Sequence, residues 1–141
     1  MIADDIMTQD PVTVTEQVSI GDALRLLSEA SIRHLPVVRG GDVVGILSDR
    51  DFRDLGVPVV TDMAGYERIR ARLSQPVSVL MTGSVVSVDR DADLSEVIEV
   101  MIEEKLSAVP VVETQTQALS GIVSYLDILR AALPFFETDE E

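Results

Sequence analysis

An internal repeat constrains the fold of this chain more than any other feature of its sequence. The segments "IMTQDPVTV" (6–14) and "LMTGSVVSV" (80–88) match, and "HLPVV" (34–38) and "AVPVV" (108–112) match at the same offset. After a short insertion, "GILSDRD" (45–51) matches "GIVSYLD" (121–127). Self-similarity of this kind indicates one supersecondary unit that is used twice. Because a unit of about 55 residues is marginally stable alone, we expect the two copies to pack together on a shared aliphatic face.

The repeats divide the 141 residues into four segments. We assign residues 1–56 to the first repeat, 57–77 to a linker, 78–134 to the second repeat and 135–141 to an acidic tail. Within the linker, "MAGYERIRARL" predicts about three helical turns, with apolar residues on one face and arginines toward solvent. This helix either covers part of the core or contributes to a dimer contact. Its apolar face comprises Met63, Tyr66, Ile69 and Leu73.

Each repeat has the same predicted order of elements: strand, helix, strand, strand, helix. Short Val/Thr and Val/Ser alternations indicate the first strands. Apolar residues at i, i+3, i+4 and i+7 then predict one helix that begins near Ile20 and another that begins near Leu94. Both helices are preceded by a capping signature. The expected caps are Ser19 with Asp22 and Asp93 with Glu96.

An apolar hairpin follows each of these helices. In the first repeat, "LPVV" and "VVGIL" flank Gly40–Gly41, a pair that suits a tight primed turn. In the second repeat, "VPVV" leads into the longer loop "ETQTQA", which contains the insertion. A second helix closes each repeat, near 49–55 and 125–133. The expected fold class is α+β, with small sheets covered by helices.

The composition excludes several classes of site and partner. The chain has no cysteine and one histidine, so Cys–His catalysis is impossible and a Ser–His–Asp set would require His34. A net charge of −14 repels nucleic acid. No apolar run approaches the roughly 18 residues that span a bilayer, and "MIADDIMTQD" lacks the features of a secretory signal. We therefore expect a cytoplasmic protein that is not an enzyme and has no metal site and no membrane contact.

The repeated Ser-x-x-Asp stretch has two explanations. The serine can cap the following helix, while the aspartate at the third helical position accepts from the backbone N–H of the serine. Alternatively, a strand-to-helix junction can hold a phosphate or another anion on its exposed N–H groups. The two explanations are compatible, because a capping serine can still offer its hydroxyl to a ligand. Basic residues near the first copy favour an anion: Arg33, His34, Arg39, Arg50 and Arg53.

With this tandem order of elements and the motifs "MTQDPVTV", "RHLPVV" and "GILSDRD", the sequence resembles the cystathionine β-synthase (CBS) domain pair, also called a Bateman module. The resemblance covers both halves, apart from the linker and the tail. It implies two repeats related by a pseudo-twofold axis, with clefts for a regulatory ligand such as AMP, ADP, ATP or S-adenosylmethionine. It also implies a homodimer that signals to a separate effector protein and requires no cofactor.

The resemblance implies ligand-binding roles for residues of both repeats. Asp51 and Asp127 are the implied ribose acceptors, since a carboxylate can accept from both hydroxyls of a diol. The implied phosphate side comprises Ser48, Ser124, Arg33, His34 and Arg50. The implied adenine slot comprises Val12, Val14, Leu35 and Pro36 in the first repeat, and Val86, Val88, Val109 and Pro110 in the second.

The two implied sites are unequal, because the basic residues of the first repeat have no counterparts in the second. Ser107–Ala108 stands in place of Arg33–His34, and Tyr125–Leu126 stands in place of Asp49–Arg50. We expect the first site to prefer a phosphorylated ligand. The second is expected to be empty, to take an uncharged adenosyl group, or to borrow an arginine from elsewhere in the module.

Two alternatives to nucleotide sensing stay open at this point. The chain could be a dimerising scaffold in which the Ser-x-x-Asp pairs serve only as helix caps. It could also sense divalent cations through its acidic surface, because hard cations prefer oxygen ligands.

Overall fold

The computed structural model describes residues 1–53, 63–81 and 84–137. The chain forms two compact units. Unit 1 comprises residues 1–11 and 86–141, and unit 2 comprises residues 12–85. Each unit therefore combines the body of one sequence repeat with the opening segment of the other.

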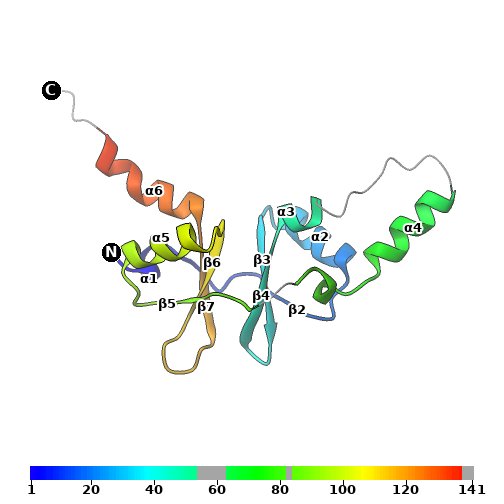
Figure 1. Cartoon of the computed structure of the whole chain (residues 1–141), viewed down its shortest axis with the longest axis horizontal. Coiled ribbons are helices and arrows are strands. Elements are labelled where there is room, and N and C mark those ends of the chain that lie inside the picture. Colours follow the sequence, from blue (N-terminus) through cyan, green and yellow to red (C-terminus); the bar gives the residue numbers. More distant parts are fainter. Residues whose placement is uncertain (54–62, 82–83, 138–141) are drawn as a thin grey trace. The chain divides into compact units, whose positions relative to one another are not determined.

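Unit 2 is built on a three-stranded sheet in the order β2-β3-β4. Strand β2 runs parallel to β3, and β3 and β4 form an antiparallel hairpin (Figure 1). The elements are β2 (Val14–Thr15), α2 (Ile20–Glu29), β3 (His34–Arg39), β4 (Asp42–Ser48), α3 (Asp49–Arg53), α4 (Met63–Leu73) and the 3-10 helix η1 (Val77–Leu80).

Unit 1 repeats this plan and adds an edge strand from the N-terminus. Its sheet has the order β1-β7-β6-β5, with β5 parallel to β6 and β1 antiparallel to β7. The elements are α1 (Ala3–Ile6), β1 (Thr8–Gln9), β5 (Val88–Asp89), α5 (Leu94–Glu103), β6 (Ala108–Val112), β7 (Leu119–Ser124) and α6 (Tyr125–Phe136).

The predicted α+β class and the order of elements within each repeat are confirmed. The last helix is longer than expected, because α6 continues through Pro134 to Phe136. Phe135 and Phe136 therefore belong to a helix and not to the tail. No helix within the described ranges is both long and apolar enough to cross a bilayer.

One of the two predicted helix caps is correct. The Oγ of Ser19 accepts a 3.1 Å hydrogen bond from the backbone N–H of Asp22, as expected. Asp93 is the N-cap residue of α5, but its side chain forms no capping hydrogen bond, so that prediction is wrong. The N–H of Leu94 at the start of α5 donates to the carbonyl of Met1 at 2.9 Å, as the N–H of Ile20 at the start of α2 donates to the carbonyl of Gln75.

The two hairpins differ in their turns as the sequence predicts. Gly40 and Gly41 have φ values of 59° and 89°, and positive φ at both central residues is what a type I′ turn requires. In unit 1 the loop 113–118 connects the paired residues Val112 and Leu119. Glycine is needed in the first hairpin because most side chains disfavour positive φ.

Each unit has its own aliphatic core, which agrees with an aromatic content of only 4%. The sequence repeats nevertheless depend on one another, because Ala3 of the first repeat is buried in the core of unit 1, and Leu80 and Met81 of the second repeat pack against the core of unit 2. The buried core of unit 2 comprises Val14, Ile20, Ala23, Leu27, Leu35, Val37, Leu47, Phe52 and Val77. That of unit 1 comprises Ala3, Val88, Ala92, Val97, Met101, Val109, Val111 and Val123.

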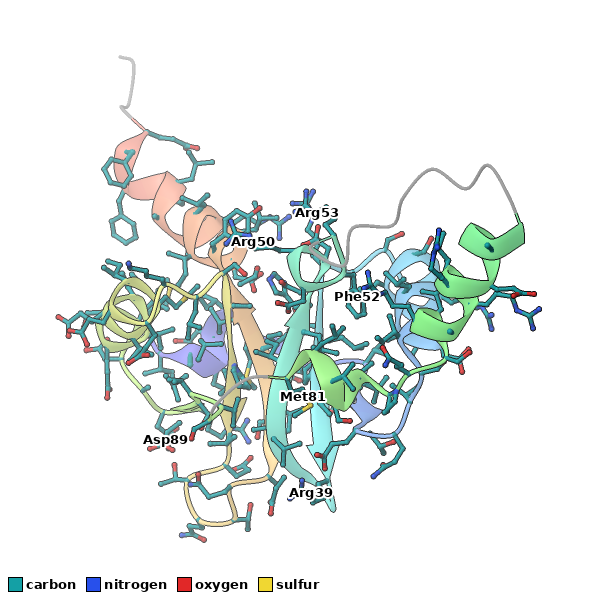
Figure 2. The ribbon with its side chains drawn as sticks, turned by 45° about the vertical axis from the view of Figure 1, so that its right-hand side comes forward. Arg39, Arg50, Phe52, Arg53, Met81 and Asp89 are labelled. Atoms are coloured by element: carbon teal, nitrogen blue, oxygen red, sulfur yellow. The ribbon has the colours of Figure 1, made fainter. Side chains whose placement is uncertain are left out.

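The glycines of "GILSDRD" and "GIVSYLD" lie under methionines of the exchanged segments. A Cβ built on Gly45 would lie 2.7 Å from Met81 Cε, and Figure 2 shows Met81 against the strands of unit 2. A Cβ on Gly121 would lie 2.5 Å from Met7 Sδ and 2.8 Å from the carbonyl oxygen of Thr8. Both glycines therefore allow a close approach that any other residue would obstruct.

The linker helix covers part of the core, as one of the two explanations proposed. Leu73 of α4 packs against the core of unit 2, and its carbonyl lies 3.4 Å from a Cβ built on Gly21 of α2. The arginines of α4 face solvent as predicted, since Arg68, Arg70 and Arg72 are all exposed. Met63 and Tyr66 were also predicted on the apolar face, but their side chains lie outside the part of the chain that the structure describes.

Candidate functional site

In unit 2 the Ser-x-x-Asp motif lies where β4 ends and α3 begins. The backbone N–H of Ser48 donates a 2.7 Å hydrogen bond to Asp51 Oδ2. The hydroxyl of Ser48 donates to the same oxygen at 3.3 Å. The Asp51 carboxylate therefore closes the first turn of α3, and these two bonds use Oδ2 only.

In unit 1 the same motif forms a complete capping box. The N–H and the hydroxyl of Ser124 donate to Asp127 Oδ2 at 2.8 and 3.1 Å. In return, the N–H of Asp127 donates to Ser124 Oγ at 3.3 Å. The aspartate therefore accepts from the serine N–H in both copies of the motif, and in unit 1 the serine also caps the helix. This arrangement leaves the ligand explanation open, because these capping bonds leave Oδ1 of each aspartate unused.

A cation that the sequence analysis missed lies beside the second motif. Arg130 Nη1 is 3.8 Å from Asp127 Oδ1. The side chain of Arg130 is 76% exposed, whereas that of Asp127 is only 16% exposed. Asp127 and Arg130 lie at i and i+3 on α6, so their spacing on a predicted helix could have identified this pair. Arg130 therefore brings a positive charge to the second motif, at a position other than those at which the two repeats were compared.

Three of the predicted phosphate-side residues of unit 2 lie at the same end of the hairpin. His34 on β3 pairs with Ser48 on β4, and the N–H of Asp49 donates to the carbonyl of Arg33 at 3.0 Å. Arg50 follows on the first turn of α3 (Figure 2). The strand register therefore brings Arg33 and His34 beside the start of α3, although the whole hairpin separates them from it along the chain.

Arg39 does not belong to this basic group, and its inclusion in the sequence-based cluster is wrong. It lies at the opposite end of the hairpin, where it pairs with Asp42 (Figure 2). Its guanidinium donates to both carboxylate oxygens of Glu16, at 2.6 and 2.8 Å. These hydrogen bonds are the largest cause that lowers the pKa of the Glu16 carboxyl below its ordinary value of 4.5.

Unit 1 has the same backbone geometry without the basic side chains. Ala108 pairs with Ser124, and the N–H of Tyr125 donates to the carbonyl of Ser107 at 2.9 Å. Ser107 and Ala108 thus occupy the places that Arg33 and His34 have in unit 2. The predicted chemical difference between the repeats therefore lies at equivalent positions of the two units.

Most residues of the implied adenine slot lie on neighbouring strands with their side chains buried, whereas Val12 and Val86 precede those strands. Val14 pairs with Val37 on β3, and Val88 pairs with Val111 on β6. A ligand at these strands would therefore meet backbone groups more than side chains. Val12 is 41% exposed and Val86 is partly exposed, whereas the buried residues are Val14, Leu35, Pro36, Val88, Val109 and Pro110.

The acidic residues do not form an evident cation site. In the part of the chain that the structure describes, no group of three or more His, Cys, Asp or Glu side chains is placed to hold a metal ion. The alternative of divalent-cation sensing therefore gains no support from the geometry.

Comparison with known proteins identifies both halves. The family model described as the CBS domain matches residues 3–58 and 77–134. The uncharacterized protein MJ1225 of Methanocaldococcus jannaschii is 30% identical over 135 residues, which are 92% of this chain and 48% of that protein. The chain spans about half or less of the length of the first curated relatives that it matches.

Two similar solved structures contain adenosine compounds. CBSX2 of Arabidopsis thaliana in complex with AMP has a TM-score of 0.76 and 29% identity, over 96% of this chain and 98% of that one. The CBS domain pair of protein MJ0100, in complex with 5-methylthioadenosine and S-adenosyl-L-methionine, has a TM-score of 0.76 and 26% identity, with the same coverage.

Proposed function

Since the chain belongs to the CBS domain family, a family of regulatory modules, we propose that it binds an adenosine nucleotide and reports it to a partner protein. The observation that carries the proposal is the duplicated strand–helix junction, with Ser48–Asp51 in one unit and Ser124–Asp127 in the other. The AMP and S-adenosyl-L-methionine complexes of similar proteins support this ligand class.

The two aspartates are the proposed ribose acceptors. In each of them the helix cap uses Oδ2, from the serine N–H and hydroxyl. A ribose diol would bind at Oδ1, which in Asp127 also faces Arg130 at 3.8 Å, and would share Oδ2 with the cap. The capping bonds would then orient the carboxylate for the ligand, so that capping and binding are one arrangement and not competing roles.

The phosphate side is proposed to differ between the units. In unit 2, Arg33, His34 and Arg50 lie near Ser48, and a phosphorylated ligand fits their charge. In unit 1, Arg130 is the cation that pairs with the motif aspartate. We therefore assign AMP, ADP or ATP to the first site. An adenosyl group without a phosphate, as in S-adenosylmethionine, suits the second.

The output of the module is proposed to pass through another protein. No catalytic residue is assigned, so the module acts through an effector and not through chemistry of its own. We propose that it works as a homodimer in the cytoplasm, without nucleic-acid or membrane contact. The adenine slot would use the backbone of the paired strands, because the side chains of Leu35 and Val109 are fully buried.

A scaffold that binds no nucleotide is the second candidate. It is favoured by one specific observation, which is that both aspartates already have a structural role as caps. A substitution to asparagine separates the two functions. The Asn carbonyl oxygen can still accept from the serine N–H, whereas the charge and the second accepting oxygen are lost.

The test is thermal unfolding with and without millimolar AMP, ADP, ATP, S-adenosylmethionine and adenosine. A ligand at about 100 times its dissociation constant adds about 2.7 kcal/mol to the free energy of unfolding, which raises Tm by several degrees. Asp51→Asn should remove the shift caused by a phosphorylated ligand and leave Tm without ligand nearly unchanged. Asp49→Asn is the matched control, because Asp49 faces Arg53 at 3.7 Å and its side chain takes no part in the Ser48–Asp51 bonds.

The outcomes discriminate between the two candidates. A shift that persists in Asp49→Asn and disappears in Asp51→Asn supports nucleotide sensing through unit 2. The same experiment with Asp127→Asn and S-adenosylmethionine tests unit 1. If a folded protein shows no shift with any of the five compounds, the nucleotide proposal is wrong and the scaffold remains.

A further inference from the structure

The two motif aspartates differ in what their second carboxylate oxygen meets. In both of them, Oδ2 accepts from the N–H and the hydroxyl of the motif serine. In unit 1 the other oxygen, Oδ1 of Asp127, lies 3.8 Å from Nη1 of Arg130. Among the residues that the structure describes, Asp51 of unit 2 takes part in no ion pair. A cation therefore faces the ribose-accepting oxygen in unit 1 and not in the described part of unit 2.

Arg130 has a single acidic residue to pair with on its own helix. Between Tyr125 and Phe136, α6 carries one carboxylate, Asp127, which lies three residues before Arg130 and on the same face. The Asp127 side chain is only 16% exposed and is held by its bonds to the motif serine. The Arg130 side chain is 76% exposed. The cation is therefore the member of this pair that can move without disturbing the fold.

In unit 2 the arginine of the corresponding helix pairs with a different carboxylate. Arg53 of α3 lies 3.7 Å from Asp49, which is not part of the Ser-x-x-Asp motif. The second repeat has Tyr125 in place of Asp49 and Leu129 in place of Arg53, so this alternative pair does not exist in unit 1.

The sequence of the first repeat also rules out a copy of the unit 1 pair. The residue equivalent to Arg130 is Asp54, and two carboxylates cannot form an ion pair. A cation that pairs with the motif aspartate from this position is therefore a property of the second repeat alone.

We propose that Arg130 competes with the ligand for Asp127 and so regulates the affinity of the unit 1 site. A ribose diol that binds Oδ1 has to displace the guanidinium from that oxygen. Binding in unit 1 therefore costs the ion pair, whereas the cap on Oδ2 stays in place. Arg130 acts on the ligand only through Asp127, so it is a positioning residue and not a ligand contact.

This competition predicts opposite salt responses in the two units. Salt screens interactions between exposed charges, so added salt weakens the Asp127–Arg130 pair and makes Oδ1 more available to an uncharged ligand. A phosphorylated ligand in unit 2 instead loses attraction to Arg33 and Arg50 under the same conditions. Adenosine should therefore bind unit 1 more tightly at high salt, and AMP should bind unit 2 less tightly.

The size of the effect is limited by the exposure of the pair. Exposed ion pairs change an equilibrium constant by a factor of about 1.5 to 5. The distance of 3.8 Å and the 76% exposure of Arg130 place this pair toward the lower end of that range. The competition therefore tunes the affinity of unit 1 and does not close the site.

This inference rests on the proposed function, because it requires that Asp127 accepts a ribose. The thermal shift with AMP through unit 2, described above, tests the proposed function without involving Arg130. Failure of the competition and failure of nucleotide binding are therefore distinguishable.

Isothermal titration calorimetry with adenosine tests the competition in a chain whose unit 2 site is removed by Asp51→Asn. In this background Arg130→Gln should raise the affinity for adenosine about two- to threefold at low salt. It should also remove the increase in affinity with salt, whereas Arg130→Lys, which keeps the cation, should retain it. Arg25→Gln is the matched control, because Arg25 on α2 forms the same i,i+3 pair with Asp22, at 3.5 Å, and its loss changes the net charge equally.

Each outcome of the titration decides for or against the competition. A higher affinity and a lost salt response in Arg130→Gln, with neither change in Arg25→Gln, support it. An unchanged or lower affinity in Arg130→Gln overturns it, even where AMP raises Tm through unit 2. If adenosine binds to none of these variants, the competition is also wrong, and the AMP shift alone decides the proposed function.

Discussion

The guanidinium of Arg39 donates two hydrogen bonds to the carboxylate of Glu16, one from Nε at 2.6 Å and one from Nη2 at 2.8 Å. The equivalent positions of the second repeat hold Arg90 and Glu113, and these two residues are also hydrogen-bonded. Both units therefore join the same two positions by an ion pair, with the charges exchanged. Arg90 in addition donates to Asp4 Oδ1 at 2.6 Å, which links α1 to the rest of unit 1.

We predict that the Glu16–Arg39 pair tolerates an exchange of its two residues, since unit 1 already has the exchanged form. Glu16→Arg and Arg39→Glu each place two like charges together and should lower the midpoint of urea unfolding at low salt. The double variant should recover most of the loss. A double variant less stable than both single variants would contradict the equivalence of the two positions. High salt should reduce all of these differences, because the Arg39 side chain is 71% exposed to solvent.

The same pair predicts a pH dependence. The Arg39 hydrogen bond lowers the pKa of folded Glu16 below 4.5, so the pair stabilises the fold fully above the unfolded value and loses its effect as the pH falls through the lower folded value. The difference in unfolding free energy between the unmodified chain and Glu16→Gln should therefore be constant near neutral pH and shrink below about pH 4.5. Urea unfolding of both proteins at a series of pH values measures this difference in unfolding free energy. A difference that grows on acidification would contradict the assigned direction.

Substitution of the two motif glycines should have unequal effects. In Gly45→Ala the new Cβ meets Met81 Cε, the end of a flexible side chain, which can move. In Gly121→Ala it meets Met7 and also the backbone carbonyl of Thr8, which is held in β1. We expect Gly121→Ala to destabilise the fold by about 1–3 kcal/mol and Gly45→Ala by less. Denaturant unfolding measures the loss of stability in each variant. If Gly45→Ala lost as much stability as Gly121→Ala, or more, the result would be inconsistent with this packing.

The capping box of α6 should be measurable apart from any ligand. Ser124→Ala removes the oxygen that accepts from the Asp127 N–H and should lower the free energy of unfolding by about 0.5–2 kcal/mol. Ser124→Thr keeps the hydroxyl and should cost clearly less. Helix content from circular dichroism and the urea midpoint give the comparison. If both variants unfold at the same midpoint, the hydroxyl does not stabilise α6.

Local patterns in the sequence predicted the features that depend on neighbouring residues. The Gly40–Gly41 turn and the Ser19 cap follow from backbone preferences over a few positions, and the structure confirms both. The Ser48–Asp51 and Ser124–Asp127 hydrogen bonds are local in the same sense. The Asp93 cap was predicted from the same kind of local signature, but the side chain of Asp93 forms no capping hydrogen bond.

Proximity along the chain is misleading where strand register separates neighbours. Arg39 and His34 are the two ends of one short strand, but the hairpin carries Arg39 to the far end, where it binds Glu16. Conversely, Arg33 precedes the whole hairpin and Ser48 ends it, yet the two lie next to the same junction in space. A β-strand extends about 3.3 Å per residue, so short separations along a strand become large distances.

The sequence by itself determined the duplication, the order of elements, the two capped junctions and the chemical difference between them. These depend on periodicity, on turn chemistry and on the identity of a few side chains, all of which can be recognised locally. Only the tertiary structure decided that each repeat lends its opening segment to the other unit, with Met81 on Gly45 and Met7 on Gly121. It also decided that α6 keeps apolar side chains exposed. Both outcomes depend on which distant surfaces meet, and the free energy of burial that selects them is non-directional and leaves no local pattern in the chain.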